Sequence, residues 1–98
     1  MADPSPRLED RVFRYAERFA LRHGLMEYPS LRAIARGLRT GARKVEEAVE
    51  GDGNGRMWTE SFLTNYTPRS DEVYVAVDSP RIEAMFRRAM GFKEEANE

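Results

Sequence analysis

The stretch PSLRAIARGLRTGARKVEEAVEG, residues Pro29–Gly51, decides the fold of this 98-residue chain. Ser30 and Thr40 are of the residue types that cap the N-termini of helices, and apolar side chains follow each of them at helical spacing. The spacing predicts two short amphipathic helices joined by a tight turn. The inward positions are Leu31, Ile34, Ala35 and Leu38 in the first helix and Val45, Ala48 and Val49 in the second.

Two further helices are predicted on either side of this pair. Apolar or small residues recur every three or four positions from Leu8 to His23, and Gly24 follows as a C-cap glycine would. Near the other end, Ser79 and Pro80 form an N-cap with proline at the first helical position. An apolar face then continues to Gly91.

Between these helices the pattern changes to that of strands. Residues 57–66 alternate, and the β-branched run 73–77 suits the partner strand of an antiparallel hairpin. A turn at 68–71 joins them, and a small additional strand near Met26 to Tyr28 is expected to pair with the hairpin. We therefore predict an α+β fold in the order helix, helix, helix, strand, strand, helix.

Length and composition indicate one domain, over residues 7–91, with a disordered tail at 1–6 and a frayed tail at 92–98. The absence of cysteine excludes disulfides, thiolate zinc sites and thiol catalysis. No apolar run is long enough to span a bilayer, and residues 1–7 lack the apolar stretch of a signal peptide. We therefore expect a cytoplasmic protein without membrane association.

The element order and the motif within residues 29–49 resemble those of the winged-helix (winged helix-turn-helix) family. That motif places Leu-x-x-Ile-Ala-x-x-Leu on a short helix, followed by a tight turn, a capping Ser or Thr, and a valine. The small residue at its centre lets the two helices cross closely. Arg39 departs from the pattern, because many relatives have glycine in the turn. The resemblance covers roughly residues 7–78, and its motif positions are Leu31, Ile34, Ala35, Leu38, Thr40 and Val45.

The resemblance implies binding of duplex DNA, in gene regulation or genome maintenance. In this family the third helix often enters the major groove, and the hairpin, or wing, touches the backbone or the minor groove. Residues 30–44 contain five cations and no carboxylate, a composition suited to phosphates. By contrast, residues 11–22 mix arginines with Glu17, as an ordinary solvated helix face does. The expected DNA contacts are Arg32, Arg36, Arg39, Thr40, Arg43, Lys44 and, at the wing tip, Arg69.

Acidic residues favour a different function. The net charge of −1 gives no overall attraction to nucleic acid, and Glu46, Glu47, Glu50 and Asp52 would repel phosphates approaching the third helix. The alternative is therefore a protein–protein interaction module that uses the same fold without nucleic acid and docks through this acidic edge or through the last helix. A purely structural subunit of a larger assembly is a third possibility.

Apolar residues outside the predicted core suggest a homodimer or partner face. Phe13 falls off the apolar stripe of its helix and is expected to be exposed. Packing of the last helix on the first within one chain would explain the same residues equally well. The candidate face comprises Phe13, Ile82, Met85, Phe86 and Met90.

No catalytic residue, metal site or cofactor is predicted, and we expect the protein not to be an enzyme. Residues 50–55, EGDGNG, are similar to the start of a calcium loop, but Arg56 and Ser61 stand where ligands are required, so a turn is expected.

His23, the one histidine, is expected on the buried side of its helix. Trp58, Phe62 and Tyr66 are expected to be core or partial core residues, with base stacking as the weaker alternative.

Overall fold

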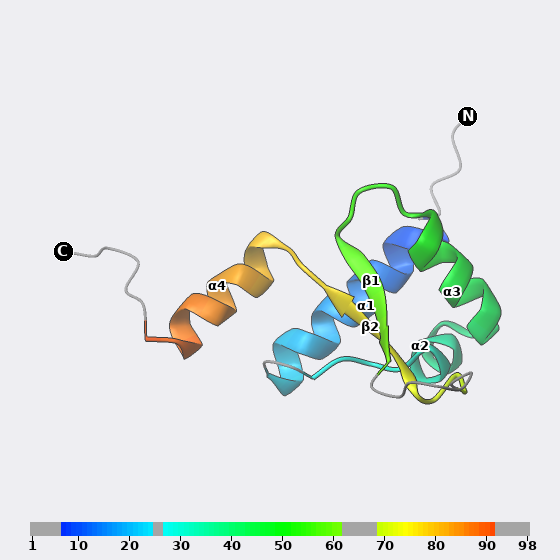
Figure 1. Cartoon of the computed structure of the whole chain (residues 1–98), viewed down its shortest axis with the longest axis horizontal. Helices are drawn as coiled ribbons and strands as arrows, with labels where there is room; N and C mark the ends of the chain where they lie inside the picture. The colour runs from blue at the N-terminus through cyan, green and yellow to red at the C-terminus, as the bar shows by residue number, and fades with distance from the viewer. Residues whose placement is uncertain (1–6, 25–26, 62–68, 92–98) are drawn as a thin grey trace.

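The computed structural model describes residues 7–24, 27–61 and 69–91. It has four helices and a two-stranded antiparallel hairpin in the predicted order, so the α+β fold class is confirmed, and the layout is consistent with a winged helix (Figure 1). The predicted tails at 1–6 and 92–98 lie outside the described residues. The elements are α1 (Leu8–His23), α2 (Leu31–Leu38), α3 (Ala42–Gly51), β1 (Met57–Ser61), β2 (Val73–Val77) and α4 (Pro80–Ala89).

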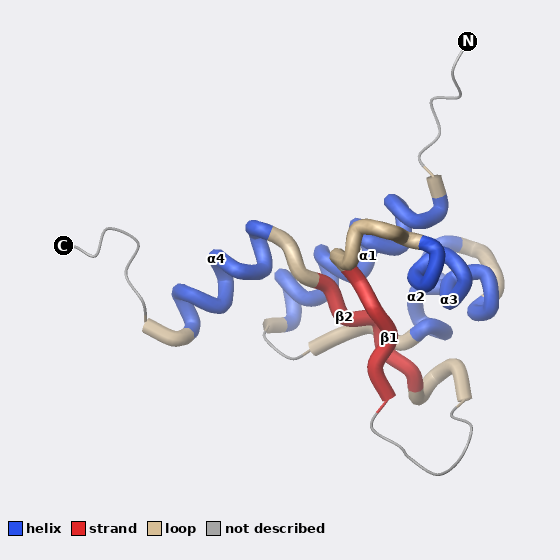
Figure 2. The backbone as a smooth tube through the Cα atoms, turned by 45° about the horizontal axis from the view of Figure 1, so that its top comes forward, coloured by secondary structure: helices blue, strands red, loops and turns tan. Residues whose placement is uncertain are grey.

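The core lies between the first three helices and the hairpin. In Figures 1 and 2 the hairpin crosses α1, while α2 and α3 lie together at one end of the molecule. Each helix contributes the apolar stripe expected from its spacing. The buried residues are Val12, Ala16 and Ala20 of α1, Leu31, Ile34 and Ala35 of α2, Val45, Ala48 and Val49 of α3, with Met57, Val75, Val77 and Ile82 from the later elements.

Serine caps begin α2 and α4, as predicted. The Ser30 hydroxyl accepts a hydrogen bond from the Ala33 amide at 3.0 Å, and the Ser79 hydroxyl accepts one from the Ile82 amide at 3.2 Å. Each bond satisfies an amide that has no partner within the first helical turn.

The predicted cap at Thr40 is wrong, because α3 has Gly41 as its N-cap and no side-chain cap. The Arg39 amide donates to the Arg36 carbonyl at 3.3 Å, and the Thr40 amide donates to the Ala35 carbonyl at 2.9 Å. These two residues therefore complete the end of α2, and the next helix begins further along the chain.

The hairpin pairs in the register Met57↔Val77, Thr59↔Val75 and Ser61↔Val73. Residues opposite each other in an antiparallel pair share a face, so Met57 lies with the buried valines. Trp58 is on the other face and is 40% exposed, so the prediction that it is a core residue is wrong. The alternating aromatics were misleading because the valines of β2 determine which face is buried. Phe62 and Tyr66 lie outside the described residues.

A contact to the hairpin occurs just before α2, but not where the extra strand was predicted. Residues 27–28 form no strand, and Met26 lies outside the described residues. Instead, Ser30 forms an isolated antiparallel bridge with Tyr74, and the Val75 amide donates to the Pro29 carbonyl at 2.9 Å. Ser30 can pair with the hairpin because its backbone is extended at the N-cap of α2 (φ −76°, ψ 162°).

The apolar face of α4 is divided between the core and the surface. Ile82 is only 3% exposed and Met85 packs against the core, so for these two residues the partner face is wrong and the alternative, packing of the last helix within the same chain, holds. Phe86 and Met90 are 37% and 65% exposed, as expected for such a face. The division follows from geometry, because only the first turns of α4 reach α1 and the rest extends away from the other helices (Figure 1).

Candidate nucleic-acid interface

The turn between α2 and α3 has the geometry that glycine usually supplies. Arg39 adopts the left-handed conformation, with φ 59° and ψ 49°. Among the described residues it is the one non-glycine residue with positive φ. Arg39 therefore holds a backbone conformation that favours glycine.

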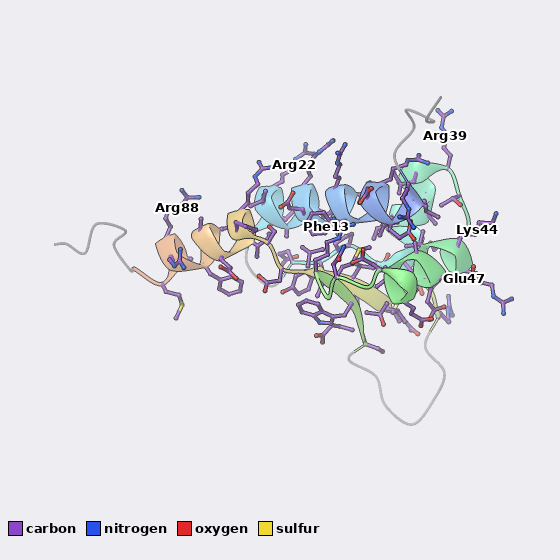
Figure 3. The ribbon with its side chains drawn as sticks, turned by 90° about the horizontal axis from the view of Figure 1, so that it is seen from above. Phe13, Arg22, Arg39, Lys44, Glu47 and Arg88 are labelled. Carbon is purple, nitrogen blue, oxygen red and sulfur yellow. The ribbon has the colours of Figure 1, made fainter. Side chains whose placement is uncertain are left out.

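All six predicted basic contact residues are exposed on the surface, and Thr40 is half-buried. Figure 3 shows Arg39 and Lys44 extending from the same end of the molecule, the end opposite Arg88. The exposed cations are Arg32, Arg36, Arg39, Arg43, Lys44 and Arg69.

The structure brings the residues after the wing next to the start of α2. The Arg32 amide donates to the Ser70 carbonyl at 3.1 Å, so Arg69, one residue earlier, lies near the same end of α2. Sequence separation hides this proximity, because 37 positions separate Arg32 and Arg69 along the chain.

Carboxylates neutralise these cations only weakly. Arg43 and Glu47 approach at 3.9 Å, and Arg69 and Asp71 approach at 3.8 Å, with all four side chains substantially exposed. Exposed pairs of this kind contribute at most about 1 kcal/mol. Phosphates could therefore displace these carboxylates at little cost.

The acidic edge of α3 is smaller than the sequence suggests. Glu47 and Glu50 are exposed and Glu46 is half-buried, but the Asp52 side chain is 4% exposed and faces Arg56. Both Asp52 carboxylate oxygens accept from Arg56 Nε, at 3.3 and 3.2 Å. Asp52 is therefore unavailable to a partner, and residues 52–56 form a turn, as predicted.

Arg56 is the centre of an ion-pair cluster that the sequence analysis missed. Its Nη2 lies 2.7 Å from Asp10 Oδ1, and its guanidinium lies 4.5 Å from the centre of the Phe13 ring. The hydrogen bond from Arg56 holds the pKa of Asp10 below its ordinary value of 3.8, and the same bond raises the pKa of Arg56. No local signal in the sequence connects these residues, which come from α1 and from the turn before β1.

The cluster also corrects the prediction for Phe13. This residue is half-buried, packs against the core and is covered by Arg56, so it belongs to no exposed partner face. In Figure 3, Phe13 lies on the inner side of α1. Phe13 lies beside the apolar stripe of α1. It is nevertheless half-buried, because it packs against the core on one side and the turn before β1 places Arg56 over its ring.

The charges of α1 are also arranged differently from the prediction. Glu17 is buried, where it accepts a hydrogen bond from the Ser79 hydroxyl at 2.6 Å. The outward face of α1 therefore does not mix signs as predicted. His23 is exposed rather than buried, and its ring lies 4.3 Å from that of Phe19, because the last turn of α1 extends past the hairpin (Figure 1).

Comparison of the chain with protein-family models, curated proteins and solved structures finds no match. Within residues 7–24, 27–61 and 69–91, no helix is long and apolar enough to cross a membrane. In the same ranges, no group of three or more His, Asp and Glu side chains is placed to hold a metal ion.

Proposed function

We propose that this protein binds duplex DNA as a winged-helix protein, in gene regulation or genome maintenance. The observation that carries the proposal is the exposed basic surface over α2, its turn and the first turn of α3. In helix-turn-helix proteins the N-terminal residues of the recognition helix contact the base edges. Arg43 and Lys44 occupy that position in α3.

The distribution of charge limits how α3 would enter the groove. Glu47 and Glu50 are exposed in its second half, where they would repel the phosphates on either side of the groove. The first turn of α3 would therefore make the groove contacts, while Arg32, Arg36 and Arg39 hold the backbone. Arg69 would anchor the wing.

Fluorescence anisotropy with a labelled duplex of random sequence, titrated with salt, tests this proposal. Phosphate contacts release counterions, so affinity should fall steeply as the salt concentration rises. The Arg43→Gln/Lys44→Gln variant should bind more weakly, and the slope of log K against log salt should fall by about 2, or about 1 for each lost contact.

The matched control is Arg87→Gln/Arg88→Gln, which removes the same charge from α4. It should retain the wild-type salt slope. Equal losses in the two variants would show that the attraction depends on overall charge and not on the proposed surface. Absence of binding by the wild type at low salt would exclude duplex DNA as a ligand.

A protein–protein interaction module is the second candidate, favoured by the exposed Phe86 and Met90, in the part of α4 that extends from the domain and at its C-cap (Figure 1). A homodimer through α4 would bury these two side chains. Sedimentation equilibrium should then detect a dimer that persists in high salt and dissociates in Phe86→Ser/Met90→Ser. A wild-type monomer at all concentrations would exclude that dimer.

A further inference from the structure

The carboxylates of α1 are all held by partners within the chain. Glu9 pairs with Arg7 at 3.5 Å, and Asp10 pairs with Arg56 at 2.7 Å. Glu17 is buried and accepts from the Ser79 hydroxyl, with an Arg81 nitrogen 3.8 Å from its other oxygen. None of the three therefore contributes a free negative charge to the outward face of the helix.

The arginines of α1 have the opposite arrangement. Arg11, Arg14, Arg18 and Arg22 recur every three or four residues, so they share one face, and all four are exposed. In the part of the chain that the structure describes, none of the four forms an ion pair within 4.0 Å. Figure 3 shows Arg22 on the outer side of α1, away from the hairpin. Within the described ranges, this face is therefore a row of four guanidinium groups with no carboxylate oxygen within 4.0 Å.

The row has the dimensions of a short stretch of polyanion. From Arg11 to Arg22 the helix advances about 16 Å, at 1.5 Å per residue. Phosphates along one strand of B-form DNA are about 3.4 Å apart along the axis, so the row can reach several in succession. Arg11 also donates to the Leu38 carbonyl at 3.3 Å, which fixes the end of the row against α2.

Aromatic rings lie along one side of this row. A hollow of about 200 Å³ is lined by Arg11, Arg14, Tyr15, Arg18 and Leu38. A second, of about 180 Å³, is lined by Tyr15, Arg18, Phe19, Arg22 and His23. Tyr15 and Arg18 border both hollows, so cationic and aromatic groups alternate along the surface.

Gly37 sets the position of the Tyr15 ring, which borders both hollows. A Cβ atom at this position would lie 2.5 Å from Tyr15 Cε2, a distance that no packed structure tolerates. The absence of a side chain therefore lets the Tyr15 ring lie directly on α2. The rings of Phe19 and His23 lie 4.3 Å apart with 38° between their planes, which leaves the outer face of the exposed His23 ring accessible.

We infer that the outer face of α1 binds single-stranded nucleic acid. The arginine row holds the phosphates, and the rings of Tyr15, Phe19 and His23 receive bases. Proteins that bind single strands combine these two features, a positive track for the backbone and aromatic rings on which bases stack. A duplex fits less well, because its bases are already stacked and cannot reach the rings. An acidic peptide without aromatic residues would pair with the arginines but has no rings to enter the hollows.

This site does not depend on the proposed duplex surface, and the experiment separates the two. Anisotropy of a labelled oligothymidine of about 12 nucleotides, within the range of single-strand site sizes, is measured as salt is raised. In Arg18→Gln/Arg22→Gln the slope of log K against log salt should fall by about 1.4, or about 0.7 for each lost phosphate contact. His23→Ala should weaken binding about fivefold or more, as expected for one lost stacking ring.

One matched variant and two competitors determine the outcome. Arg87→Gln/Arg88→Gln removes the same charge from α4 and should leave oligothymidine binding unchanged. The inference is overturned if this control loses as much affinity as Arg18→Gln/Arg22→Gln, or if His23→Ala has no effect. It is also overturned if polyglutamate competes as well as unlabelled oligothymidine, or if a duplex of the same length does so.

Discussion

Replacing Arg39 by glycine should stabilise the protein. Arg39 has φ 59° and ψ 49° at the end of α2, and a residue with a Cβ atom in this region is disfavoured by roughly 1–2 kcal/mol. Glycine avoids this cost but adds freedom to the unfolded chain, which offsets about 0.5–1 kcal/mol. The free energy of unfolding should therefore rise by roughly 0.5–1 kcal/mol. For a domain of this size that corresponds to an increase in Tm of about 4 °C.

Arg39→Ala is the matched control, because it removes the same charge and side chain but keeps the Cβ atom. In urea unfolding at neutral pH, the free energy of unfolding of Arg39→Gly should exceed that of Arg39→Ala by the same roughly 0.5–1 kcal/mol. Equal stability of these two variants would refute the conformational argument. Both variants should weaken duplex binding to the same extent, since each removes one cation from the proposed surface.

Three further predictions concern contacts between elements. Ser79→Ala should cost about 2 kcal/mol and Ser30→Ala about 1 kcal/mol, because Ser79 both caps a helix and donates to the buried carboxylate of α1; equal costs in urea unfolding would contradict this. Arg56→Gln should cost about 2–3 kcal/mol, because it leaves the enclosed Asp52 carboxylate without its partner, and a loss under about 1 kcal/mol would argue against the cluster. Asp10 has a lowered pKa in the folded protein, so its contribution is complete above its ordinary value of 3.8 and is lost as the pH falls through the lower folded value. Asp10→Asn should therefore show a smaller loss of stability on acidification than the wild type, and identical acid profiles would count against the assigned pairing.

The elements that could be predicted from the sequence are those set by neighbouring residues. The bounds predicted for α1, Leu8 to His23, match the structure, because apolar spacing and a following glycine act within a few residues. The serine caps of α2 and α4 are equally local. The turn at residues 52–56 could also be predicted, because closely spaced glycines, including those at 53 and 55, disfavour a continued helix.

The predictions that were wrong depended on distant residues. Trp58 and Met57 alternate equally well, and only pairing with β2 puts Met57 on the buried face. For Ile82 the sequence left two placements open, a partner face or packing of the last helix on the first, and only the packing of α4 on α1 puts it in the core. The spacing of side chains defines the faces of an element without specifying which neighbour covers each face.

The amino-acid sequence by itself determined the order of the elements, the apolar stripes of the helices and the basic block of residues 30–44. Only the tertiary structure decided which charges remain at the surface. Glu17 is next to Arg18 in the chain, yet Ser79 of a distant segment holds its carboxylate inside while the arginine stays in solvent. The physical reason is that burying a carboxylate requires a hydrogen-bond donor. That donor is supplied by a segment more than 60 residues away along the chain, so no local pattern could show that Glu17 turns away from the arginine row of α1.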